Sequence, residues 1–171
     1  MEESNYLIDK NGLYDRFRKF PFLSSIDEKH LGSMLRLSKM RKYYADEVIT
    51  REGEYDSFMY IIITGQVRIM KQGERIARLR RQGDTFGELA IIDGETRSAS
   101  VIADVDSILL AIDVSFIDRL GPEERDEFCA VFYKYLAEIL AKRLRETDKD
   151  LVEEREEITR IKVRTKMQSL A

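Results

Sequence analysis

The sequence predicts an α+β fold in which an antiparallel β-sandwich or roll is flanked by helices. Three observations lead to this prediction. Short strand-like segments follow one another in the middle of the chain with no helical pattern between them. Glycines fall between or beside these segments, where tight turns are needed. After Pro122 the chain contains neither glycine nor proline, so a single long helix is predicted to its end.

The first 38 residues are predicted to be helical. Apolar side chains recur at helical spacing over residues 5–20, and Pro21 is expected to end that helix. The segment Ser25-Ile26-Asp27-Glu28 has the pattern of a capping box. The helix that it opens would bury Leu31, Met34, Leu35 and Leu37.

Residues 39–113 form the predicted β-domain, because the periodicity changes from helical to strand-like after Lys39. A tight hairpin is expected around Gly65, between two runs rich in β-branched residues. The expected strands are residues 42–44, 47–51, 57–64, 66–71, 75–79, 98–103 and 107–113.

Residues 114–171 are expected to form a short helix over 114–120 and then the long helix. Pro122 suits the first position of that helix, with Glu123 and Glu124 in its first turn. A heptad spacing along the helix predicts a homodimer through paired C-terminal helices. The alternative is a helix that packs on the β-domain and frays after Leu151. The heptad positions are Ala137, Leu140, Leu144, Thr147, Leu151, Ile158 and Ile161, with Glu154 interrupting them.

Composition narrows the classes of function. The 171 residues carry a formal net charge of −3, which argues against general nucleic-acid binding. One cysteine, Cys129, fits a reducing compartment, and the chain shows neither a signal peptide nor a membrane-spanning run. A cytoplasmic protein without DNA or membrane contact is therefore expected. The basic tail, with Arg160, Lys162, Arg164 and Lys166, is read as a solvated face or a surface for an anionic partner.

No enzymatic machinery is predicted. The single histidine, His30, lies on a predicted surface helix, and no cluster of histidine or cysteine suggests a metal site. No nucleophile has a recognisable base beside it. The chain is therefore expected to bind a ligand and not to transform it, and to need no cofactor.

The segment from Phe86 to Val101 carries the strongest functional signal. Gly87 lets the backbone approach a ligand, and the N–H groups of the helical turn that follows favour an anion. Arg97 offers a planar fork of donors that matches two phosphate oxygens. Glu88 would be repelled by a phosphate, so a sugar hydroxyl is its expected partner. Replacing Arg97 is expected to cost ligand affinity and to spare the fold.

Phe86-Gly87-Glu88-Leu89-Ala90 and Arg97-Ser98-Ala99-Ser100-Val101 together resemble the phosphate-binding cassette of cyclic-nucleotide-binding domains. That family includes the bacterial catabolite activator protein, the regulatory subunits of protein kinase A and cyclic-nucleotide-gated channels. Thr96 stands where kinase relatives often have proline. The resemblance extends over about residues 20–150 and implies a jelly-roll β-barrel. The ligand-binding residues that it implies are Phe86, Gly87, Glu88, Leu89, Ala90, Arg97, Ser98, Ala99, Arg78 and Thr147.

The resemblance favours cAMP and leaves cGMP open. Ser98 is similar to a serine of the catabolite activator cassette that helps to hold the phosphate of cAMP, although a hydroxyl there also suits guanine. Arg78 lies in a strand where some cGMP-preferring relatives place an arginine against guanine; the alternative is a solvated arginine in the run Arg75, Arg78, Arg80 and Arg81. Thr147 lies where the catabolite activator has a threonine that reaches adenine; the alternative is a threonine on an exposed turn of the helix.

The function expected from the resemblance is that of a regulatory receptor module. Ligand binding would change the position of the C-terminal helix, or the geometry of a homodimer, and so signal to an unidentified effector protein. Two alternatives remain: a catabolite-activator-type transcription regulator truncated before its DNA-binding domain, and a dimerisation scaffold whose cassette is vestigial. About twenty residues follow Asp150, too few for a helix-turn-helix domain.

Overall fold

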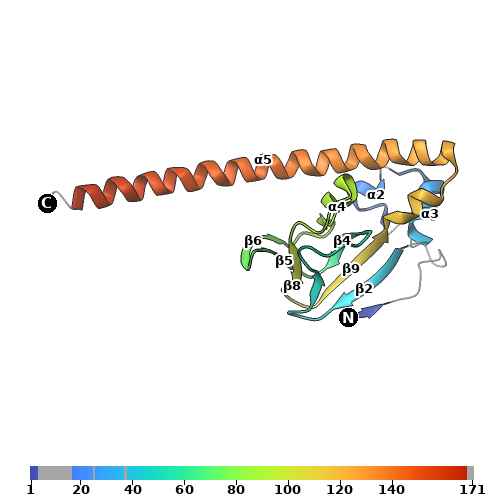
Figure 1. The fold of residues 1–171 in the computed structure, drawn as a ribbon, viewed down its shortest axis with the longest axis horizontal. Coiled ribbons are helices and arrows are strands. Elements are labelled where there is room, and N and C mark those ends of the chain that lie inside the picture. The colour runs from blue at the N-terminus through green and yellow to red at the C-terminus, as the bar shows by residue number, and fades with distance from the viewer. Residues whose placement is uncertain (4–16, 25, 37, 169–171) are drawn as a thin grey trace. The chain divides into compact units, whose positions relative to one another are not determined.

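The computed structural model describes residues 1–3, 17–24, 26–36 and 38–168 (Figure 1). The chain divides into a larger unit, Met1–Val131, and a smaller one, Phe132–Ala171. The larger unit contains every strand and the short helices, whereas the smaller unit consists of the greater part of the final helix.

Two antiparallel sheets form the larger unit, which confirms the predicted antiparallel fold. The first sheet has the strand order β1-β2-β9-β4-β7, and the second has the order β3-β8-β5-β6. The strands of the first sheet are β1 (Glu2–Glu3), β2 (Ser38–Tyr43), β9 (Ser107–Asp113), β4 (Phe58–Thr64) and β7 (Thr85–Phe86). Those of the second are β3 (Val48–Thr50), β8 (Ser100–Ala103), β5 (Val67–Lys71) and β6 (Glu74–Leu79).

The core lies between the two sheets, in the arrangement of a jelly-roll-like sandwich. Residues on alternate positions of β4 and β9 point to opposite faces of the first sheet. One set of these residues joins side chains from β5 and β8 in a single buried cluster. The members of the cluster are Tyr43, Tyr60, Ile62, Val67, Phe86, Val101, Ala103, Leu109 and Ala111.

Helices pack on the first sheet. The helix α3 (Glu28–Arg36) contacts β2 and β9, and it buries Leu31, Met34 and Leu35. A 3₁₀ helix, η1 (Val114–Arg119), buries Phe116, which meets Phe128 edge to face at 5.0 Å. Aromatic pairs of this geometry stabilise a core beyond the area that they bury.

The predicted hairpin at Gly65 is present, between β4 and β5. Gly65 has φ +98°, and a Cβ at this position would overlap Ser107 of β9. The buried Ser107 hydroxyl accepts a hydrogen bond from the Gln66 N–H at 3.1 Å. Glycine is therefore required both by the backbone angle and by the close approach of a neighbouring strand.

Several element boundaries differ from the prediction. The strand β2 begins at Ser38 and not at residue 42, because Glu3 of β1 forms ion pairs with Lys39 and Arg41, each at 2.6 Å, and so neutralises this charged strand. The short strand β7 was missed. Pro21 begins a helix, α2 (Pro21–Ser24), since proline suits a first helical turn. Most of the helix predicted over residues 5–20 lies outside the described residues, as do Ser25 and Leu37.

The predicted long helix is confirmed. The helix α5 runs from Pro122 to Gln168, with Glu123 and Glu124 in its first turn. Within the first unit, burial of Cys129 on this helix raises the pKa of its thiol. Of the helices in the described part of the chain, none has the length and apolarity that a membrane span requires.

Candidate functional site

The cassette begins where β7 ends. Phe86 is buried and its ring stacks on Tyr60 of β4, with centroids 5.0 Å apart. The next residue, Gly87, has φ +86°, which turns the chain sharply into the short helix α4 (Leu89–Asp93). Gly94, also at positive φ, ends that helix. The predicted glycine and helical turn therefore occur in the predicted order, after a strand that was not predicted.

The structure brings Gly87 and Arg97 into direct contact. The Arg97 Nη1 donates a hydrogen bond to the Gly87 carbonyl at 2.7 Å. A Cβ on residue 87 would lie 2.5 Å from that nitrogen and 2.9 Å from the carbonyl oxygen of Phe58. Only glycine leaves room for the guanidinium here.

Arg97 is buried and pairs with Asp56, a residue that the sequence did not single out. Its Nε donates to Asp56 Oδ2 at 3.0 Å, and its Nη2 donates to Asp56 Oδ1 and to the Phe58 carbonyl. The side chain of Arg97 is 3% exposed and that of Asp56 is 30% exposed. In this ion pair the Asp56 carboxylate is therefore nearer to solvent than the Arg97 guanidinium.

The loop before β4 holds Arg97 by its backbone as well. The Arg97 N–H donates to the Glu54 carbonyl at 2.8 Å, and the Gly53 N–H donates to the Arg97 carbonyl at 2.9 Å. Asp56 in turn accepts from the Phe58 N–H at 2.8 Å. This loop therefore fixes both the main chain and the side chain of Arg97. Removing Arg97 would leave the carbonyls of Gly87 and Phe58 without this donor, so we expect a loss of stability as well. That folding survives the replacement stays a prediction.

The other predicted cassette residues surround this pair. Glu88 is 1% exposed and forms the N-cap of α4, where its carbonyl accepts from the N–H groups of Ile91 and Ile92 at 3.1 Å. Leu89 and Ser98 are exposed, whereas Ala90 and Ala99 are half-buried. The cassette thus combines a buried polar centre with an exposed rim.

Arg78, for which the resemblance leaves a contact with guanine open, forms an ion pair with Asp104. It lies on the edge strand β6, directly opposite Arg68 of β5. Its Nε lies 2.5 Å from Asp104 Oδ2, and the Nη1 of Arg68 donates to Asp104 Oδ1 at 2.9 Å. The hydrogen bond from Arg68 and the charge of Arg78 hold the pKa of Asp104 below its ordinary value.

Thr147 lies on α5 in the smaller unit, and it is exposed. Its predicted contact with the nucleotide base stays a prediction.

A second group of side chains supports the cassette from β2 and β4. The Arg41 guanidinium lies over the ring of Phe58 at 4.2 Å and donates to the Tyr60 hydroxyl at 2.9 Å. Burial raises the pKa of the Tyr60 hydroxyl above its ordinary range. Tyr60 therefore remains neutral and presents its ring to Phe86 at any physiological pH. Sequence reasoning missed this support, since the contacts join residues far apart in the chain.

The described residues contain no group of three or more histidine, cysteine, aspartate or glutamate side chains that could hold a metal ion.

Comparison with known proteins places this site in a family. Residues 40–121 match the family model of the cyclic nucleotide-binding domain. A cGMP-dependent protein kinase of Plasmodium berghei is 34% identical over 101 residues, which are 59% of this chain and 12% of the kinase. A cAMP-dependent protein kinase regulatory subunit of Pyricularia oryzae is 29% identical over 115 residues, covering 66% of this chain and 30% of the subunit. The chain thus spans less than a third of either relative.

Solved structures share the fold. A cyclic nucleotide-binding domain from Methylobacillus flagellatus superimposes with a TM-score of 0.66 at 20% identity, over 78% of this chain and 79% of that one. The regulatory domain of Toxoplasma gondii PKA, crystallised with cAMP, gives a TM-score of 0.59 at 20% identity, over 76% of this chain and 53% of that one. These likenesses show the fold, and the match to the family model identifies residues 40–121 as a cyclic nucleotide-binding domain.

Proposed function

We propose that this domain binds a cyclic nucleotide, with cAMP preferred to cGMP, and that binding is a regulatory event and not a catalytic one. The contact between Gly87 and Arg97 carries the proposal. It places a permanent positive charge against a backbone turn whose glycine leaves room for the guanidinium, and such a charge would attract an anion. The family match of residues 40–121 and the names of the relatives support the class of ligand.

Arg97 would bind the phosphate by giving up part of its pairing with Asp56. Both groups are anions that accept from the same fork of N–H donors, so phosphate and carboxylate compete for Arg97. The Asp56 side chain is partly exposed, which lets water solvate it when Arg97 turns to the ligand. Glu88 would accept a hydrogen bond from the ribose 2′-hydroxyl, because a carboxylate beside a phosphate needs a donor.

The preference for cAMP is supported by the position of Arg78. A guanine contact by this arginine would require it to leave Asp104, to which it is paired at 2.5 Å. Binding of adenine would leave the ion pair between Arg78 and Asp104 intact. Ser98, exposed directly after Arg97, is available to the phosphate.

Signalling would proceed through α5. We propose that the chain forms a homodimer through this helix, that Thr147 contacts the nucleotide base, and that binding alters the helix position or the dimer geometry. The effector would be another protein, in keeping with kinases and kinase regulatory subunits among the relatives.

Isothermal titration calorimetry and thermal unfolding of the full chain test this function. We expect cAMP to bind one site per chain, to raise the midpoint of unfolding by mass action, and to bind more tightly than cGMP. The acyclic 5′-AMP is the matched control and should bind weakly. If neither cyclic nucleotide binds or stabilises the protein, the receptor function is wrong and a scaffold with a vestigial cassette takes its place.

A further inference from the structure

The smaller unit presents a row of exposed apolar side chains along α5. Leu144, Leu151 and Ile158 recur at intervals of one heptad and are 62%, 46% and 50% exposed. Ile161, three residues further on, is 57% exposed. In the usual notation the first three occupy position a and Ile161 occupies position d. Such a row is typical of the seam of a coiled coil, although the other d positions of this stretch hold Thr147 and Glu154. Exposed apolar side chains are costly to leave in water.

Charged residues flank this seam in a definite order. Position g is occupied by Arg143, Asp150 and Glu157, and position e by Asp148, Arg155 and Lys162. In a parallel pair of helices in register, each g residue meets the e residue five places further along the partner. Every one of these meetings joins opposite charges: Arg143 with Asp148, Asp150 with Arg155, and Glu157 with Lys162.

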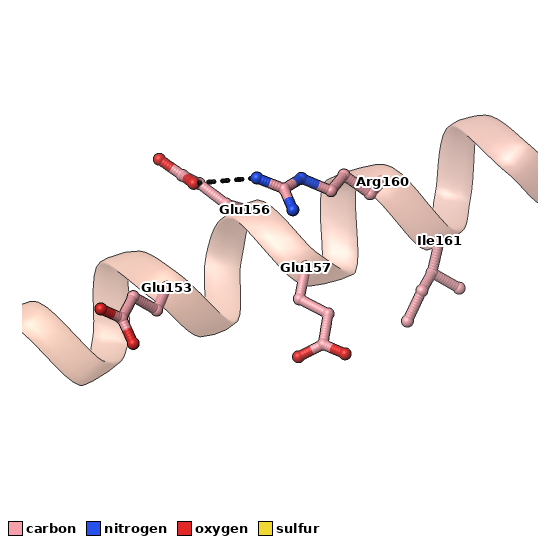
Figure 2. Close-up of a pocket in the computed structure, with 5 residues that line it drawn as sticks. All are labelled: Glu153, Glu156, Glu157, Arg160 and Ile161. Atoms are coloured by element: carbon pink, nitrogen blue, oxygen red, sulfur yellow. Dashed lines mark ion pairs between the residues drawn. The ribbon is translucent and has the colours of Figure 1, made fainter.

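Two ion pairs within the helix lie on its outer face. Lys149 pairs with Glu153 at 3.7 Å, and Arg160 pairs with Glu156 at 3.5 Å, all at the outer positions c and f. Figure 2 shows the Glu156–Arg160 pair on one side of the helix, whereas Glu157 and Ile161 project from the other side. The outer face thus carries two ion pairs of its own, and Glu157 and Ile161 project together from the side opposite the Glu156–Arg160 pair.

We propose that the occupant of this face is a second copy of the chain, with the two helices parallel and in register over residues 143–162. The inference rests on the homodimer of the proposed function and adds its orientation, register and pairing charges. It does not depend on which nucleotide binds.

The antiparallel arrangement is disfavoured by the same charges. With Leu144 opposite Ile161, residues at g meet residues at g and residues at e meet residues at e, which brings Asp150 against Glu157 and Asp148 against Arg155. The first contact is repulsive and the second is attractive, and each occurs twice by symmetry. Exposed ion pairs are weak one at a time, but the parallel pair is attractive at all three flanking contacts whereas the antiparallel pair is mixed, so the charges favour the parallel orientation.

Disulfide trapping separates the two orientations. Leu144→Cys and Ile161→Cys are each placed in a full-length Cys129→Ser background and oxidised under mild conditions. In the parallel dimer each introduced cysteine lies beside the same cysteine of the partner helix, so each variant forms a covalent dimer by itself. In the antiparallel dimer, identical cysteines lie about 25 Å apart along the axis, at about 1.5 Å per residue, which is too far for a disulfide. Only a mixture of the two variants would then cross-link.

Val152→Cys is the matched control, since Val152 is also apolar and 55% exposed but lies at the outer position b. Covalent dimers from both seam variants, with little from the control, support the inference. Cross-linking only in the mixture, none at all, or equal cross-linking at Val152 overturns it.

Sedimentation equilibrium on the Cys129→Ser protein provides a second test that keeps the apolar seam intact. Glu157→Lys replaces two attractive contacts by two repulsive ones and should weaken dimerisation about tenfold. Adding Lys162→Glu should restore the affinity, whereas Glu156→Lys on the outer face should leave it unchanged. Failure of the second charge reversal to rescue the first would contradict the pairing.

Calorimetry with cAMP on the same proteins distinguishes the two proposals. A protein that binds cAMP but fails both dimer tests overturns the interface alone. One that cross-links as expected but binds no cyclic nucleotide overturns the proposed ligand alone.

Discussion

Substitution of Gly87 by alanine separates two costs that the structure places on one residue. The first is the φ angle of +86°, which costs a residue with a Cβ roughly 1–2 kcal/mol. About 0.4–1 kcal/mol of this cost is offset, because alanine has less conformational entropy than glycine in the unfolded chain. The second is the contact of the new Cβ with Arg97 at 2.5 Å and with the Phe58 carbonyl at 2.9 Å. Because the Phe58 carbonyl is backbone, the arginine has to move.

Gly73→Ala is the matched control, because Gly73 has φ +85° and a Cβ there would meet nothing within 4 Å. We expect Gly73→Ala to lower the free energy of unfolding by about 1 kcal/mol, the net cost of the angle. Gly87→Ala should lose that amount and in addition about 2 kcal/mol for a displaced charge-assisted hydrogen bond. At roughly 2–4 °C per kcal/mol for a domain of this size, the midpoints of unfolding should fall by about 3 °C and about 9 °C.

Thermal and urea unfolding of both variants, followed by circular dichroism, measures the difference, and cAMP titration shows whether affinity falls with it. Cyclic nucleotide binding should survive in Gly73→Ala and be strongly weakened in Gly87→Ala. Equal losses of stability in the two variants would refute the reasoning, because the Arg97 contact would then contribute nothing beyond the backbone angle.

Three further predictions concern the ribose, the nucleotide base and the ion pairs of Asp104. A 2′-deoxy analogue of cAMP should bind about tenfold more weakly by calorimetry, because it offers Glu88 no hydroxyl; equal affinity would remove that role. Thr147→Val should weaken cAMP binding by about 1 kcal/mol while leaving sedimentation as a dimer unchanged or stronger, and normal binding would rule out the base contact. In the folded protein the pKa of Asp104 is lowered from its ordinary value of 3.8, chiefly by the hydrogen bond from Arg68. The ionised carboxylate therefore stabilises the fold fully above pH 3.8, and this contribution is lost as the pH falls through the lowered pKa. Asp104→Asn should therefore cost about 1 kcal/mol in urea unfolding at pH 7 and lose less stability than the unmodified protein on acidification to pH 3, whereas parallel curves would contradict this.

Features set by local sequence were predictable. Strand residues such as those of β9 combine β-branched and apolar side chains, and the glycine at position 65 stands where the hairpin turns. The approach of Gly87 and Arg97 also follows from local chemistry. A positive-φ turn, a five-residue helix and a second turn bring the chain back on itself.

Features set by distant contacts were not predictable. Asp56 precedes Arg97 by 41 positions, and nothing in the loop around it distinguishes this carboxylate from its neighbours. Its role depends on β4 lying beside β7, which is a property of the whole sheet. The early start of β2 depends similarly on Glu3, more than 30 residues away.

The central claim is that the Arg97 guanidinium holds the phosphate of a cyclic nucleotide. Calorimetric titration of cAMP into Arg97→Lys tests it most directly, at a temperature where circular dichroism shows the variant to be folded. Lysine keeps the charge but loses the planar fork, and Arg68→Lys, which alters an arginine paired with Asp46 and Asp104, is the control. We predict that the affinity of Arg97→Lys for cAMP falls at least about tenfold while that of the control is unchanged. Equal affinity in Arg97→Lys and the unmodified protein would contradict the claim.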